Sequence, residues 1–556
     1  MTYKKLRNFL IKEKIDYFIL PNSDEFFLEY LPNHEKRIEF ISGFSGSAAS
    51  IVFCTKQKKS QFFTDGRYIL QAKNQLNLAN YDVVNIIENP ILQWFENNLK
   101  KSQKIAIDTK LSSIEFVEKL QKIAKNKVCE IIFLSQNPVD KIWQDRPKKL
   151  PSKIYDLPLK YVGIDSKTKI SNIIKNLKTD AMLLSNSESI CWLLNIRASD
   201  VEFSPLLASY AMVYKSGEVS VGAIHELPLQ NPIKSIELDP SQTNYAIYKS
   251  FLDKKIKIIK AKNPILAKKA IKNKTEIKNA IKAHKIDGLA VTKFLFWLDN
   301  AVKNGEKIDE IHAEKKLLEF RQENKEFLYP SFATISSYAS NGAVIHYHAT
   351  KETNKKIIGN SLYLIDSGGQ YFLGTTDITR TVAIGTPTAE MIENFTLVLK
   401  GHIALAQAEF SNKTTGLELD KLARQFLKKA GKDYAHGTGH GVGSFLSVHE
   451  SPPAISPRAI KQRFKAGMIV SNEPGFYKEN EYGIRIENLV LVNKIKDKLT
   501  FKTLTLAPID YRLLNKKMLT AKEKNWLKNY HKKVFATHES HLDDAQKSWL
   551  SAFCEF

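Results

Sequence analysis

The chain has 556 residues, of which 43% are hydrophobic and 26% charged, and its formal net charge is +24. This length exceeds what one hydrophobic core usually supports, so about two to four domains are expected, and no apolar run reaches the ~18 residues that a membrane-spanning helix needs. The lysines are scattered along the whole chain and accompany no recognition motif, which argues against nucleic-acid binding.

The chain begins with a short basic amphipathic stretch, MTYKKLRNFL, that lacks the apolar core of a secretory signal. The four cysteines are far apart and form no CxxC pair, which is typical of reduced thiols and not of a disulfide framework or a structural zinc site. We therefore expect a cytoplasmic protein without a membrane partner.

Residues 1–137 alternate helical and strand-like segments. The strand-like segments are DYFIL (16–20), SIVFC (50–54), QFFTDGRYIL (61–70) and VVNII (83–87), and a helix is expected around Ile114–Ala124. This alternation predicts a first α/β domain. The residues that follow, 138–158, are rich in Pro, Lys and Asp and are typical of a linker.

A second α/β pattern completes residues 138–272. Its segments are AMLLS (181–185), the helical SESICWLLNI (187–196), YAMVYK (210–215) and VSVGAI (219–224). Their order resembles that of residues 1–137 and is compatible with a duplicated domain, although the similarity between individual residues does not establish one.

The pattern changes at about residue 273. A long helical stretch, Thr275–Asn304, precedes a strand-rich region with glycine turns that extends to residue 498, which predicts an α+β domain. The last residues, 499–556, contain short helices rich in Trp, Tyr and His. They are too few to form an independent core, so we expect them to pack on the preceding domain.

Two aspartates mark one predicted hairpin. Asp366 ends an apolar run and precedes a Ser-Gly-Gly turn signal, and Asp377 lies eleven residues later at the start of another β-prone run. A hairpin would bring the two carboxylates together, where like charges need a cation between them. Taken alone, the pair is interpreted more simply as turn and cap residues.

Three histidines follow in the glycine-rich segment HGTGHGVGSFLSVHE. His436 and His440 are four residues apart, but the glycines between and around them argue against a helical HxxxH zinc site. The segment matches neither GxGxxG nor a phosphate-binding loop with its lysine. Glycines let a backbone approach a ligand or metal closely, so these two histidines and His449 are candidate site residues.

Two glutamates complete the set. Glu473 closes an apolar strand before a Pro-Gly turn, and Glu487 lies within the apolar segment IRIENLVLV. The two-residue period of a strand puts Glu487 on the same face as Arg485. Burying an acid there is costly unless it is paired or metal-bound, so the sequence predicts either a salt bridge to Arg485 or a metal ion.

Considered jointly, these acids and one imidazole predict a site for two divalent metal ions. The candidate ligands are Asp366, Asp377, His440, Glu473 and Glu487. An oxygen-rich set of this kind favours Mn²⁺ or Co²⁺, and such a pair of ions can generate hydroxide at neutral pH and polarise a carbonyl. Other catalytic interpretations fit less well, because GFSGS (43–47) is not a GxSxG elbow and no cysteine lies in a nucleophile-like setting.

The segments IDSGGQYFLGTTDITRT, HGTGHGVGSFLSVHE, NEPGFY and YGIRIENLVLV resemble, in unbroken order, the motifs of the pita-bread metallopeptidases of family M24, in their Xaa-Pro aminopeptidase (aminopeptidase P) branch. SNGAVIHYHAT matches upstream, ISGFSGSAA, FTDGRYILQA, DKIWQDRP and CWLLNIRASDVEFSP match the N-terminal domains, and LTLAPIDYRLL and NWLKNYHKKV match the C-terminal extension of the long, three-domain form. The resemblance implies two creatinase-like α/β domains (1–137 and 138–272), an α+β pita-bread catalytic domain (273–498) and a small helical extension (499–556).

This resemblance also implies a role for each ligand. Asp366 would chelate one ion, while Asp377 and Glu487 would bridge both. His440 and Glu473 would complete the second ion, and Glu473 would also take a proton from a bridging water, leaving hydroxide to attack the scissile carbonyl. Mn²⁺ is the favoured ion, with Co²⁺ or Zn²⁺ as alternatives.

Other residues would face the substrate or support a ligand. His346 and His449 resemble histidines that stabilise the tetrahedral oxyanion or relay protons, and His436 would line the pocket near the prolyl ring. Arg485 would orient the glutamate that follows it on the strand. Arg67, in the DGRY segment, matches a substrate-contacting arginine of the N-terminal domain.

The implied reaction is release of the N-terminal residue from peptides with proline in the second position, by a homodimeric enzyme. A prolidase-type Xaa-Pro dipeptidase is the nearest alternative, and the second α/β domain and the C-terminal extension argue against it. The intact ligand set argues against a metal-free creatinase-type hydrolase and against an inactive peptide-binding module. A methionine aminopeptidase would not normally carry two preceding α/β domains.

Overall fold

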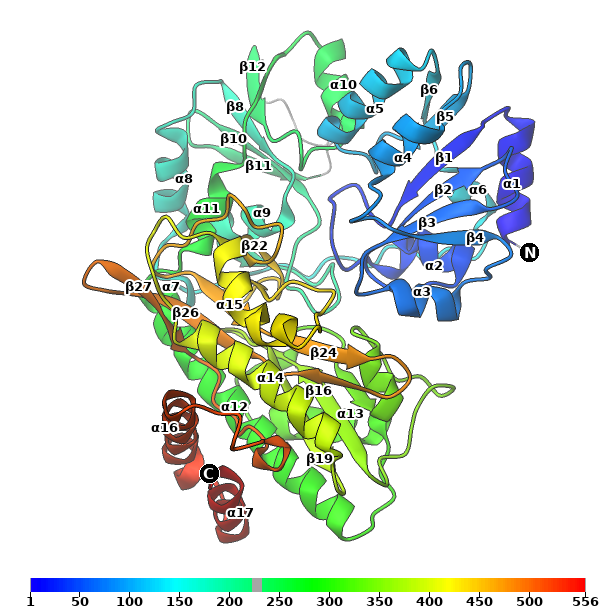
Figure 1. Cartoon of the computed structure of the whole chain (residues 1–556). Helices are drawn as coiled ribbons and strands as arrows, with labels where there is room; N and C mark the ends of the chain where they lie inside the picture. Colours follow the sequence, from blue (N-terminus) through cyan, green and yellow to red (C-terminus); the bar gives the residue numbers. More distant parts are fainter. Residues whose placement is uncertain (1, 223–232, 556) are drawn as a thin grey trace. The chain divides into compact units, whose positions relative to one another are not determined.

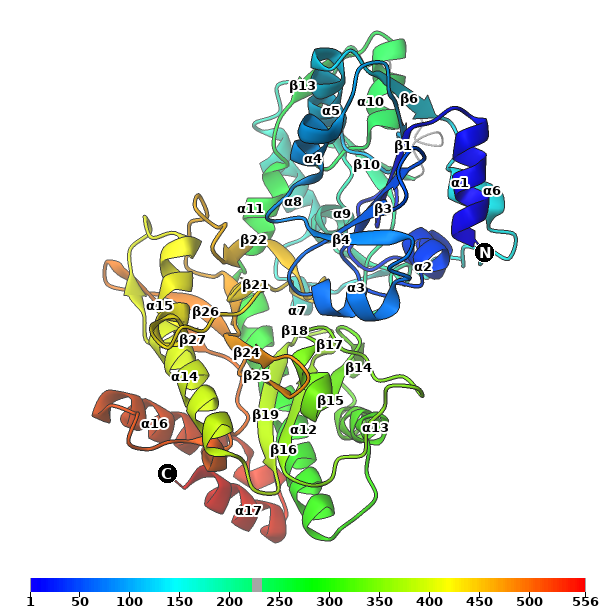
Figure 2. The same ribbon diagram turned by 45° about the vertical axis from the view of Figure 1, so that its right-hand side comes forward.

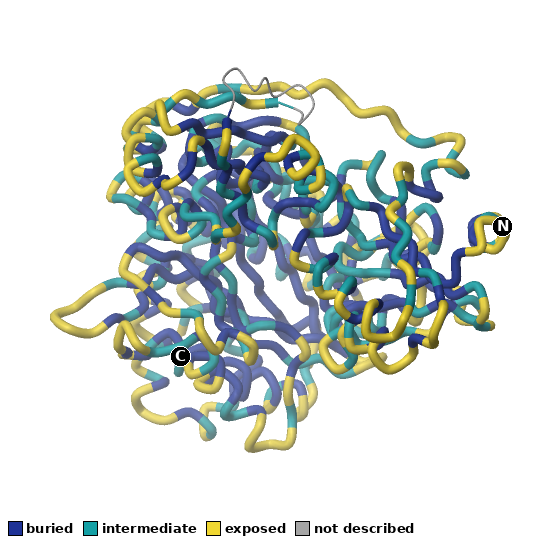
Figure 3. The backbone as a smooth tube through the Cα atoms, turned by 90° about the horizontal axis from the view of Figure 1, so that it is seen from above, coloured by how far each residue is buried: buried dark blue, intermediate teal, exposed yellow. Residues whose placement is uncertain are grey.

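The computed structural model describes residues 2–222 and 233–555, and its described part forms two compact units (Figure 1). The N-terminal unit comprises residues 1–157 and 164–265, and the C-terminal unit comprises residues 158–163 and 266–556. Figure 3 colours the chain by residue burial, with buried residues mostly in the interior and exposed residues mostly at the outer turns. Ala223 and Ile224 of the expected strand VSVGAI lie outside the described residues. No helix of the described residues is long and apolar enough to cross a membrane.

The first sheet of the N-terminal unit has six strands in the order β4-β3-β2-β1-β5-β6. The strands are β1 (Tyr17–Pro21), β2 (Ser50–Cys54), β3 (Ser60–Thr64), β4 (Tyr81–Asn85), β5 (Lys104–Asp108) and β6 (Glu130–Leu134). The surrounding helices are α1 (Thr2–Lys12), α2 (Arg37–Ser42), α3 (Ile69–Gln75), α4 (Ile91–Asn98), α5 (Ile114–Asn126) and α6 (Pro138–Ile142). Helix α5 begins where the Ser113 side chain accepts a hydrogen bond from the Phe116 amide, and it buries one apolar face. The α/β prediction is confirmed.

The second sheet of this unit has five strands in the order β11-β10-β8-β12-β13. They are β8 (Ala181–Leu184), β10 (Tyr210–Tyr214), β11 (Val219–Gly222), β12 (Ser235–Leu238) and β13 (Lys257–Lys260), with helices α8 (Ser166–Ile174), α9 (Ser187–Leu194) and α10 (Tyr245–Asp253). In chain order, these five strands correspond to β1, β2, β3, β5 and β6 of the first sheet. In each set the first strand pairs antiparallel with the second, and the second antiparallel with the third. The fourth strand then pairs parallel with the first, and the fifth parallel with the fourth. The repeated topology supports a duplicated domain.

The segment expected to be a linker begins as a helix. Asn137 caps α6, and Val139 is completely buried against the core of the first sheet. Arg37 pairs with Asp140 at 2.7 Å, which fixes α6 to α2. The Pro, Lys and Asp content that suggested a linker is concentrated after this helix.

The C-terminal unit begins with a long helix, α12 (Lys274–Lys303), whose first turn is closed by a capping box between Asn273 and Glu276. Helix α13 (Glu310–Gln322) packs on α12, and together they cover a three-stranded sheet in the order β15-β16-β19. Its strands are β15 (Ile335–Tyr338), β16 (Ser361–Ser367) and β19 (Ile378–Ile384). Figure 2 shows both helices beside these strands.

A second helix pair, α14 (Ala389–Ala406) and α15 (Gly416–Lys429), packs on the other strands of this unit (Figure 2). The six-stranded sheet has the order β20-β27-β26-β23-β21-β22, and β24 and β25 form a separate hairpin. The strands are β20 (Glu409–Phe410), β21 (Gly439–Gly441), β22 (Glu450–Ile455), β23 (Ile469–Asn472), β24 (Gly475–Lys478), β25 (Tyr482–Arg485), β26 (Asn488–Ile495) and β27 (Lys498–Thr503). A Cβ on Gly401 would lie 2.1 Å from the Ala423 carbonyl oxygen, so this glycine lets α14 and α15 approach closely.

The C-terminal residues form α16 (Ala521–His538) and α17 (Asp544–Cys554). Leu527, Val534 and Leu550 of these helices share one buried cluster with α14 residues such as Val398. Their packing on the preceding domain is therefore confirmed.

Candidate metal centre

The hairpin predicted around Asp366 and Asp377 is present. Strand β16 pairs with β19 in an antiparallel register that places Asp366 opposite Thr379, so Asp377 reaches the same end of the sheet. Between them lie β17 (Gly369–Tyr371) and β18 (Gly374–Thr375), which join β14 (Phe327–Pro330) in a small sheet. A Cβ on Gly368 would lie 2.0 Å from the Thr376 carbonyl oxygen, so the turn requires glycine. Both aspartates are buried, at 8% and 4% exposure.

His440 lies in the middle of β21, where glycines allow a tight approach between strands. A Cβ on Gly439 would lie 2.0 Å from the Ser471 carbonyl oxygen on the neighbouring strand. The His440 Nδ1–H donates to the Gly441 carbonyl at 2.9 Å, which fixes the ring so that Nε2 is the nitrogen on the side of the acids. That Nε2 lies 3.5 Å from Asp377 Oδ2 and 3.4 Å from Glu473 Oε1.

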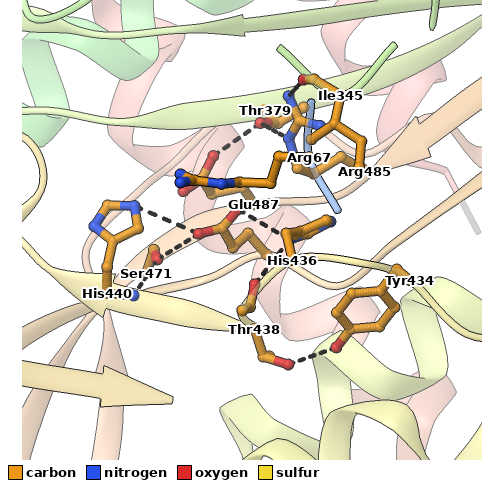
Figure 4. Close-up of polar contacts among 12 residues, drawn as sticks. Arg67, Ile345, Thr379, Tyr434, His436, Thr438, His440, Ser471, Arg485 and Glu487 are labelled. Atoms are coloured by element: carbon orange, nitrogen blue, oxygen red, sulfur yellow. Dashed lines mark hydrogen bonds and ion pairs between the residues drawn. The ribbon is translucent and has the colours of Figure 1, made fainter. Parts of the chain in front are cut away.

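The two glutamates come from different strands, and Figure 4 shows Glu487 in one group with Thr379, Arg485, His440 and Ser471. Glu473 follows β23, and Ser471 Oγ donates to its Oε1 at 3.0 Å. Glu487 lies between β25 and β26, and its Oε2 accepts a hydrogen bond from Thr379 Oγ1 at 2.8 Å. One ligand atom each of Asp377, His440 and Glu487 lies within 4.8 Å of the others.

Burial and mutual repulsion raise the pKa values of Asp377, Glu473 and Glu487. Burial, followed by the charges of Asp366 and Glu473, raises the pKa of Asp377 well above its ordinary value. Burial, followed by the charge of Asp377, does the same to the pKa of Glu487. Burial raises the pKa of Glu473 to about 7, with Arg485 opposing the shift.

The donor set fits divalent cations. Asp366 Oδ1 and Glu487 Oε1 are buried and accept no hydrogen bond, although buried carboxylate oxygens normally do. Four clustered acids, two of them with an unsatisfied oxygen, would be strongly destabilised as carboxylates without more positive charge than the single Arg485 guanidinium supplies. Carboxylate oxygens suit hard divalent ions and an imidazole suits borderline ones, so four acids and His440 fit hard or borderline divalent ions.

Arg485 does not pair with Glu487 as the strand period suggested. Its Nη2 donates to Asp366 Oδ2 at 2.5 Å, its Nε to Thr379 Oγ1 at 3.2 Å and its Nη1 to the Tyr477 hydroxyl at 2.6 Å. The predicted strand is interrupted at 486–487, because the Glu487 amide leaves the β25 ladder and donates to the Thr379 carbonyl. Among the described residues, Thr379 Oγ1 is the hydrogen-bonding group that links Arg485 to Glu487.

The other predicted histidines surround these acids to different degrees. The His449 ring lies edge-on to His440, with 4.4 Å between ring centres. His436 is buried: its Nε2 accepts from the Tyr477 hydroxyl at 2.9 Å, and its Nδ1 lies 3.7 Å from Glu473 Oε2. His346 is half-buried in the turn after η2 (Ala339–Ala343).

The turn that carries His346 is fixed from two sides. The Ile345 carbonyl, one residue earlier, accepts from Arg485 Nη2 at 3.5 Å. Glu310, which is completely buried, accepts from the Tyr338 amide at 2.6 Å and from the Tyr347 hydroxyl at 2.8 Å. The site and the start of α13 thus hold the turn together.

Arg67 belongs to the N-terminal unit. Its guanidinium forms a two-pronged ion pair with Asp65, with contacts of 2.9 Å and 2.7 Å. The position of the guanidinium is therefore set by the DGRY segment itself.

Sequence reasoning did not identify Thr379, which connects Glu487 to Arg485, or Tyr477, which connects His436 to Arg485. Thr379 lies two residues after Asp377 on a strand, so the period of two contained a signal for it. Tyr477 ends the NEPGFY segment and lies on β24, which pairs with the strand of Arg485. Only the pairing of these two strands reveals the contact.

Comparisons with known proteins agree with this architecture. Residues 278–494 match Metallopeptidase family M24, residues 3–139 and 145–226 match two Creatinase/Prolidase N-terminal domain families, and residues 497–555 match the C-terminal region of peptidase M24. The chain is 37% identical to Xaa-Pro aminopeptidase 1 of Dictyostelium discoideum, covering 96% of this chain and 92% of that protein. It is 36% identical to a probable Xaa-Pro aminopeptidase P of Laccaria bicolor, covering 99% and 92%.

A solved structure is also similar over the full length. X-prolyl aminopeptidase of Caenorhabditis elegans, described as a cytosolic enzyme with a di-nuclear active site, superposes with a TM-score of 0.93 at 32% identity. The match covers 100% of this chain and 99% of that one.

Proposed function

The chain belongs to metallopeptidase family M24, and from this membership we propose that it is an Xaa-Pro aminopeptidase, which releases the N-terminal residue from peptides with proline in the second position. The observation that carries the proposal is the convergence of Asp377, His440 and Glu487, with buried, unsatisfied oxygens on Asp366 and Glu487, in a chain similar to such enzymes over its whole length. These groups supply the ligands that metal-dependent peptide hydrolysis requires.

The site is proposed to hold two divalent ions, with Mn²⁺ favoured and Co²⁺ or Zn²⁺ as alternatives. Asp366 would bind one ion, Asp377 and Glu487 would bind both, and His440 and Glu473 would bind the other. When bound, a pair of such ions lowers the pKa of water and polarises the scissile carbonyl. The oxygen-rich donor set supports Mn²⁺.

The surrounding side chains are proposed to move protons and bind the substrate. Glu473, with its pKa raised to about 7, accepts the proton of the attacking water on a carboxylate oxygen. His449, packed edge-on against His440, and His346 donate hydrogen bonds to the oxygen that gains negative charge. His436 lines the prolyl pocket.

Binding and assembly complete the proposal. Arg67 contacts the substrate, and its pairing with Asp65 would hold the guanidinium ready. We also propose four domains, at 1–137, 138–272, 273–498 and 499–556, in a cytoplasmic homodimer. Proline in the second position has no N–H, so a dedicated pocket must replace ordinary backbone recognition.

Metal-dependent cleavage of matched peptides tests the activity. The metal-free protein is loaded separately with Mn²⁺, Co²⁺ or Zn²⁺ and given Xaa-Pro-Xaa, Xaa-Pro and Xaa-Ala-Xaa peptides. We expect cleavage of Xaa-Pro-Xaa only after metal is added, and fastest with Mn²⁺. Equal cleavage of the alanine peptide, or full activity without metal, would overturn the proposal. Activity confined to Xaa-Pro would indicate a prolidase, and metal binding without turnover an inactive peptide-binding module.

A further inference from the structure

Arg380 is a buried guanidinium that has only neutral partners. It is 1% exposed on β19, and within residues 2–222 and 233–555 no carboxylate pairs with it. Its acceptors are the carbonyl oxygens of Thr379, Glu487, Ala507 and Pro508, the side-chain oxygen of Asn488 and the hydroxyl of Tyr530. Desolvating a guanidinium is expensive, and the full set of acceptors offsets that cost.

One end of this network holds the backbone around Glu487. Arg380 Nη1 donates to the Glu487 carbonyl at 2.7 Å, and Nη2 donates to Asn488 Oδ1 at 2.8 Å. The Glu487 amide in turn donates to the Thr379 carbonyl at 3.1 Å. The carboxylate is held by Thr379 Oγ1, so Thr379 and Arg380 together fix the amide, the carbonyl and the side chain of Glu487.

A second branch reaches the segment of Glu473. Asn488 Nδ2 donates to His402 Nε2 at 3.2 Å, and His402 Nδ1 donates to the Asn472 carbonyl at 3.1 Å. Burial, and then the charge of Arg380, lowers the pKa of His402 to about 3, so the imidazole is neutral and can make both bonds. Asn472 directly precedes Glu473.

The other end of the network comes from the C-terminal region. The Tyr530 hydroxyl, on α16, accepts from Arg380 Nη2 at 2.8 Å and donates to the Ala507 carbonyl at 2.8 Å. The Tyr530 ring stacks on Trp526, with 5.3 Å between centres. Since the ring is held by stacking, the hydroxyl can be removed with little loss of packing.

We propose that Tyr530 is a positioning residue of the metal centre. It acts through Arg380 on Glu487, and through Asn488 and His402 on the segment of Glu473. The C-terminal region thereby raises the affinity of the site for its metal ions, in addition to covering the core. This inference rests on the proposed function, because it treats Glu487 and Glu473 as ligands.

Replacing Tyr530 by Phe tests the inference. Mn²⁺ affinity is measured by competition with a chelating dye, together with kcat, KM and Tm. We expect Mn²⁺ to bind about 10-fold more weakly, as is usual when support of a ligand is lost. Activity should fall at limiting Mn²⁺ and recover in excess Mn²⁺, with KM unchanged.

Tyr210→Phe is the matched control in the N-terminal unit. Tyr210 is completely buried, and its hydroxyl donates to the Glu25 carbonyl at 3.0 Å and accepts from Asn244 at 2.8 Å. Removing this hydroxyl costs comparable hydrogen bonds, so Tm should fall while Mn²⁺ affinity stays unchanged. A parent protein that binds no metal would overturn the proposed function. A parent that binds two ions, with equal affinity in Tyr530→Phe, would overturn only the role of Tyr530.

Hydrogen exchange gives a second test that needs no variant. By thermodynamic linkage, if Tyr530 favours metal binding, then bound metal must favour the Tyr530 contacts by the same free energy. Amides of residues 505–509 and 527–534 should exchange more slowly when Mn²⁺ is added to the parent protein. Unchanged exchange in both segments would contradict the inference.

Discussion

Glu473 combines two properties that a general base at a metal centre needs. It is close to His440 and His436, and burial raises the pKa of its carboxyl group to about 7 in the metal-free protein, which makes it a stronger base than an exposed glutamate. We predict that Glu473→Ala lowers kcat at least ~10²-fold, because proton transfer by a positioned group contributes this much or more. The metal-free variant should be as stable as the parent or more so, since one repelling acid is removed.

The measurement is kcat under excess Mn²⁺, paired with Tm in chelator. Glu481→Ala, on the exposed turn between β24 and β25, is the control and should leave kcat unchanged. Wild-type-like turnover of Glu473→Ala would refute the role given to this carboxylate.

The raised pKa values also predict how pH acts on stability. The pKa of Glu473 rises from its ordinary 4.5 to about 7, and burial raises the pKa values of Asp377 and Glu487 as well. At a pH between the ordinary pKa of such a group and its raised pKa in the folded protein, the unfolded chain holds fewer protons than the folded one. The metal-free protein therefore loses stability as pH rises through this range. Metal ions bind the deprotonated groups, so the gain in Tm on adding Mn²⁺ should increase from pH 5 to pH 8. A gain that is constant over this range would contradict the prediction.

The sequence allowed candidate site residues to be chosen where the signal is local, but it did not predict which side chains they contact. The candidate ligands could be chosen from strand ends and turns, because burying an acid after an apolar run is unfavourable unless the acid is paired or metal-bound. Of the two alternatives for Glu487, the salt bridge to Arg485 was wrong, since a period of two was applied across the break at 486–487. The true partner of Arg485, Asp366, lies 119 residues away along the chain.

At the scale of elements, a buried charge cluster joins the segment just before α12 to β22. Glu450 accepts from Lys269 Nζ at 2.9 Å and also pairs with Lys272, and the three side chains are at most 1% exposed. Removing the carboxylate would leave two buried ammonium groups without this negative counter-charge. We predict that Glu450→Gln lowers the free energy of unfolding by about 3–5 kcal/mol.

Urea unfolding measures this loss, and a charge-free variant provides the control. Lys269→Met, Lys272→Met and Glu450→Met combined should regain most of the stability, because buried ion clusters can be replaced by apolar side chains of similar volume. If Glu450→Gln is as stable as the parent, the cluster is not held by the pairing that the structure shows.

Elements were predicted well where one pattern extends over their whole length. Strand β2 coincides with the predicted SIVFC, and α12 lies within one residue of the predicted helix, because uniform apolar runs and a capping box mark their ends. The division of IRIENLVLV between β25 and β26 was not predictable, since β25 pairs with β24 while β26 pairs with β23. Partner strands decide such a break, and they are distant in sequence.

At the scale of the whole molecule, each unit has its own sheets and its own buried clusters. The cores of the two N-terminal sheets are separate from the clusters under α12 and α14 in the C-terminal unit. All five proposed metal ligands belong to the C-terminal unit. A bound metal ion directly stabilises only the unit whose unfolding destroys the metal site.

Calorimetry should therefore resolve two thermal transitions, of which Mn²⁺ raises only one. At a free concentration of 100 times Kd, one bound ion adds about 2.7 kcal/mol to the unit that binds it. Tyr210→Phe assigns the transitions, because it removes buried hydrogen bonds from the N-terminal unit and should lower only the transition that Mn²⁺ leaves unchanged. A single transition that Mn²⁺ and Tyr210→Phe both shift would show that the two units unfold as one cooperative body.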